Sequence, residues 1–191
     1  MVDRYYGYIV PIVVVIGVIV FWAVITYNKL VAKRECVRES WSSMDVQLKR
    51  RSNVVGNLIN TDKGYADHEN ETLEAVTQMR ARAEAAAEGG TGERQTAEGE
   101  LSTALMRLFA VAENYPELKA DGTFIELQKT LSDLEDEIQM ARRFYNGRVR
   151  NLNTSIGSVP GNIIAKQFAF QPAEYYEVDH ASDKILPKVE F

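Results

Sequence analysis

The sequence is poor in cysteine, histidine and proline, and it carries no excess of positive charge. Cys36 is the only cysteine among 191 residues, so the chain cannot form an intrachain disulfide, as expected in a reducing compartment. The formal net charge is −5 at pH 7. Nucleic-acid binders normally carry a basic surplus that neutralises phosphates, and the sequence therefore predicts no nucleic-acid partner.

Motifs for catalysis or cofactor binding are missing as well. His68 and Glu69 form the His-Glu dipeptide with which the zinc-protease helix motif begins. Thr72 occupies the position of the second histidine that this motif requires. The glycine-rich stretch EGGTGERQ (residues 88–95) lacks the preceding strand and the Lys-Ser/Thr ending of a phosphate loop, and we predict that it is a connecting loop. We expect no catalytic residue, no metal site and no cofactor.

One long apolar run is present near the start of the chain. Residues 8–26, YIVPIVVVIGVIVFWAVIT, contain no charge, and as a helix they span about 28 Å, close to the hydrocarbon thickness of a bilayer. A cleaved signal peptide would have a shorter apolar core and a small-x-small cleavage site, whereas TYNKLVAKR follows here. We therefore predict a short N-terminal segment over residues 1–7 and an uncleaved transmembrane helix over residues 8–26.

Flanking charges predict the orientation of this helix. Only Arg4 precedes the apolar run, whereas the basic residues that closely follow it are Lys29, Lys33, Arg34 and Arg38. Because the cytoplasmic side of a transmembrane helix carries the excess of Lys and Arg, the N-terminus is expected outside and the rest of the chain in the cytoplasm.

Residues 27–160 show helical periodicity and almost no strand pattern. The first apolar stripe comprises Leu30, Val37, Trp41, Met44, Leu48, Val55 and Leu58. No proline occurs between Tyr27 and Asp62, so the membrane helix can continue into the first soluble helix, with a break or bend expected near Gly56 or Gly64.

Three further helices follow in the pattern. The second is expected to begin near Asp67, and the third ends before Pro116. The fourth is predicted from capping-box spacing between Thr123 and Glu126, with an apolar stripe from Phe124 to Ile156 that implies a helix of about 50 Å. We predict an all-α fold in which about four long helices form an antiparallel bundle, and the heptad-like spacing also allows a coiled coil between chains.

The C-terminal tail, residues 161–191, is predicted to be partly extended. Its aromatic residues Phe168, Phe170, Tyr175 and Tyr176 are too many for a disordered segment, so part of the tail is expected to pack on the bundle. Val189 and Phe191 flank Glu190 at the end of the chain. They are candidates for binding a partner by strand addition, unless this end also packs on its own bundle.

Three adjacent basic residues, Lys49, Arg50 and Arg51, interrupt the first soluble helix. Successive helical residues are about 100° apart, so the three cannot face one surface, and Lys49 lies about 34 Å along a straight helix from Thr26. Arg51 falls on the apolar stripe one heptad after Met44. It therefore needs a carboxylate, from Asp45 or from an acid in residues 135–137, or else its side chain snorkels at the edge of the stripe.

Several sequence blocks, taken in order, resemble the LemA family of membrane proteins. They are YNKLV, WSSMDVQLKRRSNVVGNLINTDKGYADHE, YPELKADGTFIELQKTLSDLEDEI, ARRFYNGRVRNLN, VPGNIIAKQFAF and the closing LPKVEF. The resemblance covers nearly the whole chain. It implies a bacterial inner-membrane protein with a cytoplasmic helical bundle and no established enzymatic activity, in a family some of whose members are associated with magnetosome membranes.

Two functional hypotheses follow from these observations. The first is a non-enzymatic, membrane-anchored scaffold or adaptor that associates with itself or with another protein. The second is a small-ligand sensor or enzyme that uses a polar pocket within the bundle, where Asn28, Asp45, Arg51, Tyr145 and Asn146 are expected to converge. Such buried polar groups also serve simply to fix helix register, which is the interpretation we favour.

Overall fold

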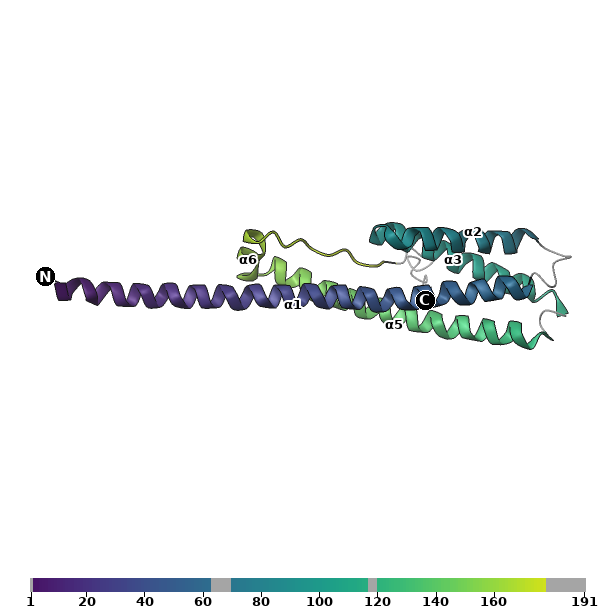
Figure 1. Cartoon of the computed structure of the whole chain (residues 1–191), viewed down its shortest axis with the longest axis horizontal. Coiled ribbons are helices and arrows are strands. Elements are labelled where there is room, and N and C mark those ends of the chain that lie inside the picture. The colour runs from purple at the N-terminus through teal and green to yellow at the C-terminus, as the bar shows by residue number, and fades with distance from the viewer. Residues whose placement is uncertain (1, 63–69, 117–119, 178–191) are drawn as a thin grey trace, which may run out of the picture. The chain divides into compact units, whose positions relative to one another are not determined.

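The computed structural model describes residues 2–62, 70–116 and 120–177. These residues form the helices α1 (Val2–Asp62), α2 (Asn70–Ala85), α3 (Thr91–Ala112), α5 (Gly122–Gly157) and α6 (Gly161–Gln167), with a short 3-10 helix η2 (Ala86–Glu88) after α2 (Figure 1). The part of the chain that is described contains no strand, and the predicted all-α class is confirmed. Gly64, Val189 and Phe191 lie outside the described residues.

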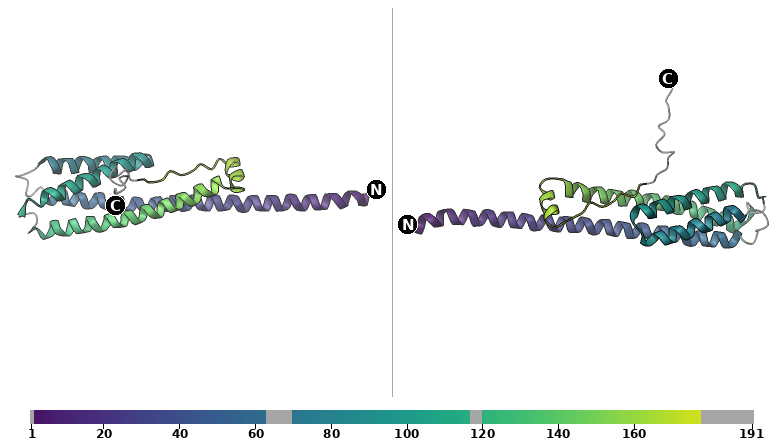
Figure 2. Two further views of the ribbon diagram at one scale, coloured as in Figure 1. Left: turned by 180° about the vertical axis from the view of Figure 1, so that it is seen from behind. Right: turned by 90° about the horizontal axis from the view of Figure 1, so that it is seen from above.

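The chain divides into two compact units. Unit 1 comprises residues 1–40 and 146–174, and unit 2 comprises residues 41–145 and 175–191. The helices α1 and α5 each contribute one part to both units. In unit 2, α2 and α3 lie side by side in all three views (Figure 1, Figure 2).

Helix α1 continues without a break through the position where we expected one. Gly56 is buried inside the helix, and a Cβ atom there would lie 3.0 Å from Cζ of Arg80 on α2. The glycine thus lets a guanidinium approach the α1 backbone, and it does not end the helix. The predicted break near Gly56 is therefore wrong, because packing against α2 supports the backbone at this point.

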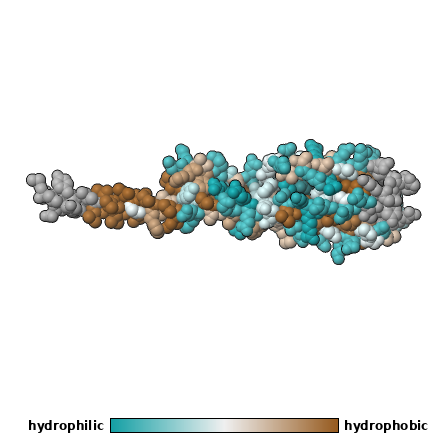
Figure 3. All heavy atoms as spheres, viewed as in Figure 1, coloured by the Kyte–Doolittle hydropathy of each residue, from teal (hydrophilic) through white to brown (hydrophobic). Residues whose placement is uncertain are grey.

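The first part of α1 is apolar around its whole circumference. Side chains from Val10 to Ile25 are mostly exposed, and they form the strongly hydrophobic surface in Figure 3. By length and composition this helix can cross a membrane. A helix that is apolar on every side and uncovered by protein needs an apolar environment, because each exposed side chain would otherwise be hydrated at a free-energy cost.

The core of unit 2 follows the predicted apolar stripes. Met44, Leu48, Val55 and Leu58 of α1 are fully buried, and so are the corresponding side chains of the other helices, including Val76, Leu101, Leu108, Phe124, Leu131, Leu134 and Ile138. Each set recurs every three or four residues, which places it on one helix face. Burial of these side chains stabilises the bundle, at roughly 1.5–3 kcal/mol per large apolar side chain.

Two helix starts differ from the predictions. Helix α3 begins at Thr91, so residues 91–95 of the expected glycine-rich loop are helical, and Gly90 is the extended residue before them. Helix α5 is capped by Asp121, whose Oδ1 accepts hydrogen bonds from the backbone N–H groups of Thr123 (2.7 Å) and Phe124 (3.0 Å). Asp121 is the better cap because its carboxylate satisfies two amides at the positive end of the helix dipole.

Unit 1 contains a helical hairpin in which α6 packs on α1 and α5. Ile164 and Ala165 of α6 form a buried cluster with Leu30 of α1, and Trp22 packs against it. The ring of Phe168 lies 4.8 Å from the ring of Tyr27. The first part of the predicted tail therefore packs on the long helices.

A turn after α6 redirects the chain along α5. Ala169 has a φ of 54°, and the backbone N–H of Phe170 donates to the carbonyl of Ala165 at 2.9 Å, as in a Schellman motif. The Asn153 side chain of α5 then pairs with both backbone groups of Ala173, each at 2.9 Å. This extended segment is thus held by hydrogen bonds that a sequence pattern does not reveal.

We predict that Gly161→Ala destabilises unit 1. A Cβ atom at Gly161 would lie 2.5 Å from the carbonyl oxygen of Ser155, so α6 would have to shift away from α5. The expected loss in the free energy of unfolding is about 1–3 kcal/mol, as for other overpacking substitutions. Chemical denaturation of the full chain in detergent, followed by circular dichroism, measures it.

The matched control is Gly147→Ala within α5. No atom lies within 4 Å of a Cβ built at Gly147, and alanine is the better helix former by about 0.5–1 kcal/mol. This variant is expected to be at least as stable as the natural chain. Equal effects of the two substitutions would contradict the close approach of α6 to α5.

Candidate functional site: a buried arginine-glutamate network

Arg51 of α1 is buried among charged and polar partners from α3 and α5. Its side chain is 2% exposed, and its Nη1 donates to Glu135 Oε2 and Ser102 Oγ, each at 2.8 Å. Its Nη2 donates to the carboxylate of Glu98 and, at 3.2 Å, to the backbone carbonyl of the same residue. Arg51 thus joins three helices through one planar guanidinium.

A second buried arginine, Arg94, extends this network. It is 4% exposed, and its Nη2 pairs with Asp45 Oδ1 of α1 at 2.5 Å. Its Nε lies 3.8 Å from Glu98 Oε1, and its Nη1 donates to the carbonyl of Ala87 at 3.2 Å. Glu98 therefore lies between two guanidinium groups, one on the neighbouring helix and one a single turn earlier on its own helix. We call Asp45, Arg51, Arg94, Glu98, Ser102 and Glu135 the charge network.

Aromatic rings lie over the Arg94 side of the charge network. The guanidinium of Arg94 lies 6.0 Å from the ring centroid of Trp41, within the range of a cation–π interaction. The centroid of the Trp41 ring lies 5.3 Å from that of Tyr145 and 6.1 Å from that of Tyr176. Both tyrosines are buried, so the rings limit the access of water to the charges beneath them.

Burial controls the protonation of two groups in this region. Loss of hydration raises the pKa of the Glu98 carboxyl above its ordinary value of 4.5, and this effect outweighs the opposite influence of Arg51 and Arg94. Burial, followed by the nearby Glu98 charge, also raises the pKa of Tyr176 to about 12. The Tyr176 phenol is therefore neutral at physiological pH and is a hydrogen-bonding group, not an anion.

The charge network occupies positions that the helical pattern assigns to the core. Arg51 lies one heptad before Leu58, and Arg94 lies one heptad before Leu101. Glu98 lies one heptad before Leu105, so it shares the inner face of α3 with these leucines. The sequence signal for the site is hence a pair of opposite charges, four residues apart, in line with an apolar stripe.

The structure distributes the predicted polar residues over both units. Asp45, Arg51 and Tyr145 lie in unit 2 at or beside the charge network, whereas Asn28 is exposed and Asn146 is half-buried in unit 1. Of the two expected partners of Arg51, Glu135 binds it, and Asp45 binds Arg94 instead. The sequence does not identify Arg94, because residues 88–95 are predicted to be a loop, and it does not identify Glu98, whose partner Arg51 lies on another helix.

The three adjacent basic residues have three different environments. Lys49 is exposed, and Arg50 is exposed with a weak contact to Glu137 at 3.5 Å. Arg51 is fully buried, so the alternative of a side chain that snorkels at the edge of the stripe is wrong. The hydrogen-bond acceptors on α3 and α5 that surround the guanidinium explain why Arg51 points inward.

The C-terminal segment reaches the charge network through Tyr176. Next to this buried tyrosine, the backbone N–H of Glu177 donates to Oε1 of Gln95 on α3 at 3.0 Å. The segment thus adds one aromatic ring and one backbone hydrogen bond to unit 2. No sequence pattern indicated which tail aromatic would be buried.

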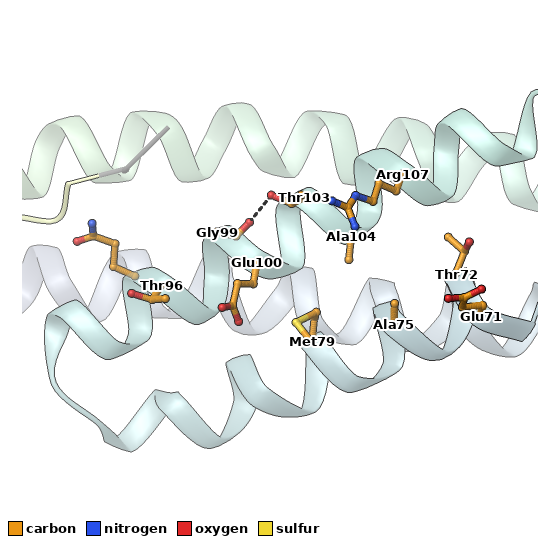
Figure 4. Close-up of a pocket in the computed structure, with 11 residues that line it drawn as sticks. Glu71, Thr72, Ala75, Met79, Thr96, Gly99, Glu100, Thr103, Ala104 and Arg107 are labelled. Carbon is orange, nitrogen blue, oxygen red and sulfur yellow. Dashed lines mark hydrogen bonds between the residues drawn. The ribbon is translucent and has the colours of Figure 1, made fainter. Parts of the chain in front are cut away.

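A groove of about 650 Å³ runs between α2 and α3 (Figure 4). Its volume is in the range of ligand pockets, and several of its polar groups have partners within the protein. The hydroxyls of Thr96 and Thr103 donate to carbonyls one turn earlier on α3, and Glu100 pairs with Arg82 at 2.7 Å. The groove does not coincide with the polar residues predicted for a ligand site.

The fold and the charge network define a helical-bundle protein with one N-terminal helix that is long and apolar enough to cross a membrane. A family model described as the LemA family matches residues 40–191, and the chain belongs to this family.

Similar proteins include the magnetosome proteins MamQ 1 and MamQ 2 of Paramagnetospirillum magneticum, each 27% identical over 90% of this chain and 73% of the relative. Protein LemA of Metamycoplasma hominis is also 27% identical, over 90% of this chain and 81% of its own length.

We predict that Arg51→Met strongly destabilises the protein. The substitution keeps the volume of the side chain but leaves Glu98 buried with one guanidinium fewer, and breaking such a buried pair costs about 3–5 kcal/mol. The free energy of unfolding of the full chain in detergent measures the effect. The double variant Arg51→Met with Glu98→Met is expected to be more stable than Arg51→Met alone, because no unpaired carboxylate remains at position 98.

Arg50→Met is the control at the adjacent position. Arg50 is 58% exposed in its pair with Glu137, and surface pairs of this kind contribute about 0–1 kcal/mol. If Arg50→Met and Arg51→Met lowered stability equally, the inward placement of Arg51 would be contradicted.

We also predict a pH dependence that originates at Glu98. Between 4.5 and the raised pKa, the folded state binds a proton at Glu98 and the unfolded state does not. The contribution of Glu98 to the free energy of unfolding therefore increases as the pH falls through the raised pKa, and it levels off below 4.5. Above the raised pKa the buried charge lowers stability by a constant amount.

The measurement compares the natural chain with Glu98→Gln over this pH range. The difference between their free energies of unfolding, natural chain minus variant, is expected to rise as the pH falls. A difference that decreased on acidification would mean that the two arginines outweigh burial and lower the pKa of Glu98.

Proposed function

We propose that this protein is a non-enzymatic, single-pass scaffold of the bacterial inner membrane, with its N-terminus outside and its helical bundle in the cytoplasm. The observation that carries this proposal is the continuity of α1 over Val2–Asp62. The same helix supplies the apolar segment that can cross a membrane and one inner face of the bundle. A bundle built on its own membrane helix is suited to hold partners at a membrane surface.

The charge network supports a structural role for the bundle. Its charged groups bind one another across α1, α3 and α5, and the two arginines and Glu98 are buried. Groups committed in this way fix which helix faces meet, as buried polar groups do in other helical assemblies. A catalytic acid or nucleophile would instead need access to a substrate.

Apolar side chains on the outside of unit 2 support self-association. Val46 lies one turn before Arg50 on α1, and Met140 lies one turn after Glu137 on α5. The Arg50–Glu137 ion pair joins these two helices, so Val46 (60% exposed) and Met140 (55% exposed) belong to the same face. We call it the α1/α5 face, and we propose that a second copy of the chain covers it.

The comparisons support a role at a membrane. The two MamQ relatives are named as magnetosome proteins, and the family resemblance implies an association with magnetosome membranes. The basic residues after the apolar run support the cytoplasmic placement of the bundle. We propose that the scaffold contributes to the organisation of a membrane region through assembly of its bundles.

Crosslinking in intact cells tests orientation and assembly together. A membrane-permeant, amine-reactive crosslinker is expected to yield dimers or larger species, because lysines such as Lys49 and Lys129 lie on the cytoplasmic side. An impermeant reagent of the same reactivity is expected to leave Lys49 and Lys129 unmodified, as measured by peptide mass spectrometry. In Val46→Glu/Met140→Glu the dimer signal should fall about tenfold, which corresponds to about 1.4 kcal/mol of lost association free energy.

Met106→Glu is the matched control for the single variant Val46→Glu, since Met106 is an exposed apolar side chain on α3. It introduces the same charge as Val46→Glu and should leave the crosslinked fraction unchanged. Modification of Lys49 or Lys129 by the impermeant reagent would overturn the orientation. Monomer alone under every condition, with no co-purifying protein, would overturn the scaffold.

A further inference from the structure

The hairpin around α6 exposes apolar side chains beside the end of the apolar run. We call residues 158–170 the α6 hairpin. Val159 is 78% exposed, Ile163 is 60% exposed and Phe168 is 56% exposed. Apolar side chains concentrated in so short a surface segment indicate an interaction site, because their contact with water is unfavourable.

Packing places the α6 hairpin at the level of the end of the candidate membrane segment. Trp22 and Ala23, in the last turns of the apolar run, pack against the cluster formed by Leu30, Ile164 and Ala165. The Phe168 ring contacts Tyr27, which directly follows the run. The exposed apolar surface of the hairpin is therefore continuous with that of α1, where Phe21 and Val24 are the last strongly exposed side chains.

Helix α6 has one face buried against α1 and another face exposed. Ile164 and Ala165 are buried against α1, whereas the neighbouring Ile163 is exposed and has no part in that buried cluster. Lys166 is exposed on the next turn. An apolar residue beside a lysine on a short exposed helix is the arrangement found where helices lie in a membrane interface.

A small basic pocket lies next to the α6 hairpin, entirely within unit 1. It has a volume of about 200 Å³, and the groups that line it include Lys29, Lys33, Ser155 and Ser158. Nζ of Lys33 donates to the Ser155 hydroxyl and, at 3.4 Å, to the carbonyl of Asn151. An ammonium group has three donors, so Lys33 retains a donor for an external anion beyond these two partners.

We propose that the α6 hairpin is a second membrane contact. It lies in the headgroup region of the leaflet at which α1 emerges, with Val159, Ile163 and Phe168 against the acyl chains. The pocket beside it binds the phosphate of an anionic phospholipid through Lys29 and Lys33. This inference rests on the proposed function, because it requires α1 to span the membrane.

Continuity and charge favour a lipid surface over a protein partner at this site. The exposed side chains of the hairpin adjoin the uncovered apolar surface of α1, which lipid surrounds if α1 spans the membrane. Lys29, Lys33, Arg34 and Lys166 add positive charge where anionic headgroups lie. A phospholipid layer presents acyl chains next to anionic phosphates. The exposed apolar side chains of the α6 hairpin likewise lie next to the lysines of the pocket.

An environment-sensitive probe at Ile163 tests the membrane contact. The full chain with Cys36→Ser and Ile163→Cys is labelled with a nitrobenzoxadiazole fluorophore and incorporated into nanodiscs of phosphatidylglycerol and phosphatidylcholine. Interfacial helices bury their apolar face about 5–10 Å into the boundary of headgroups and acyl chains. We expect emission shifted to the blue and collisional quenching by iodide several-fold weaker than for a probe in water.

Met106→Cys in the same background is the matched control. Met106 is also an exposed apolar side chain, at 59%, and it lies on α3, which is not part of the α1/α5 face. A probe there is expected to be quenched as in water. Equal quenching at positions 106 and 163, in a chain that co-elutes with the nanodiscs, would overturn the hairpin contact while the membrane anchor stands.

Lipid selectivity tests the basic pocket. Native mass spectrometry of the chain released from mixed nanodiscs is expected to show retained phosphatidylglycerol, and Lys29→Gln/Lys33→Gln should lose this preference. Lys49→Gln/Arg50→Gln removes the same charge from exposed positions in unit 2 and should keep it. Unchanged selectivity in the first variant would overturn the pocket, and a natural chain that fails to enter nanodiscs at all would overturn both the anchor and the inference.

Discussion

The bundle depends on the burial of two arginines around one glutamate. Desolvation of a charge costs several kcal/mol even in real proteins, so Arg51 and Arg94 can lie inside only because Glu98, Glu135 and Asp45 reach them. The compensation is incomplete, because Nε of each arginine is buried without a hydrogen-bond partner. The network therefore adds less to net stability than an apolar core of equal volume would, and its main effect is specificity.

That specificity appears as helix register. Leucine stripes alone would tolerate a shift of one helix along another, since many apolar side chains can fill similar spaces. A guanidinium that must meet Glu98 on α3 and Glu135 on α5 at the same time does not tolerate such a shift. The position of the tail is fixed in a similar way, because Tyr176 has to contact the ring of Trp41.

Unit 1 is stabilised by a different kind of contact. Its contacts are mainly apolar, between Leu30, Ile164 and Ala165, with hydrogen bonds from Asn153 to the extended segment after α6. Uncovered apolar side chains there are numerous, whereas unit 2 conceals most of its own. This contrast is what the proposed membrane anchor requires, because apolar surface that is unfavourable in water is favourable in lipid.

The sequence by itself was sufficient for the properties that depend on local periodicity. The all-α class, the apolar run and the stripes of α1 and α5 arise from residues spaced along one helix, where position in sequence determines the face. Arg51 was recognised as anomalous for the same reason, and an acid in residues 135–137 was among its expected partners. The family resemblance arises from an ordered series of sequence blocks.

Only the tertiary structure decided which helices supply the partners of each charge. The glycines at 89, 90 and 92 suggest a loop at Arg94, and only contacts with Asp45 and Arg51 on α1 show that Arg94 and Glu98 lie inside the bundle. The helix continues through Gly56 because α2 packs against it there. These outcomes rest on contacts between residues distant in sequence, which no single-helix pattern encodes.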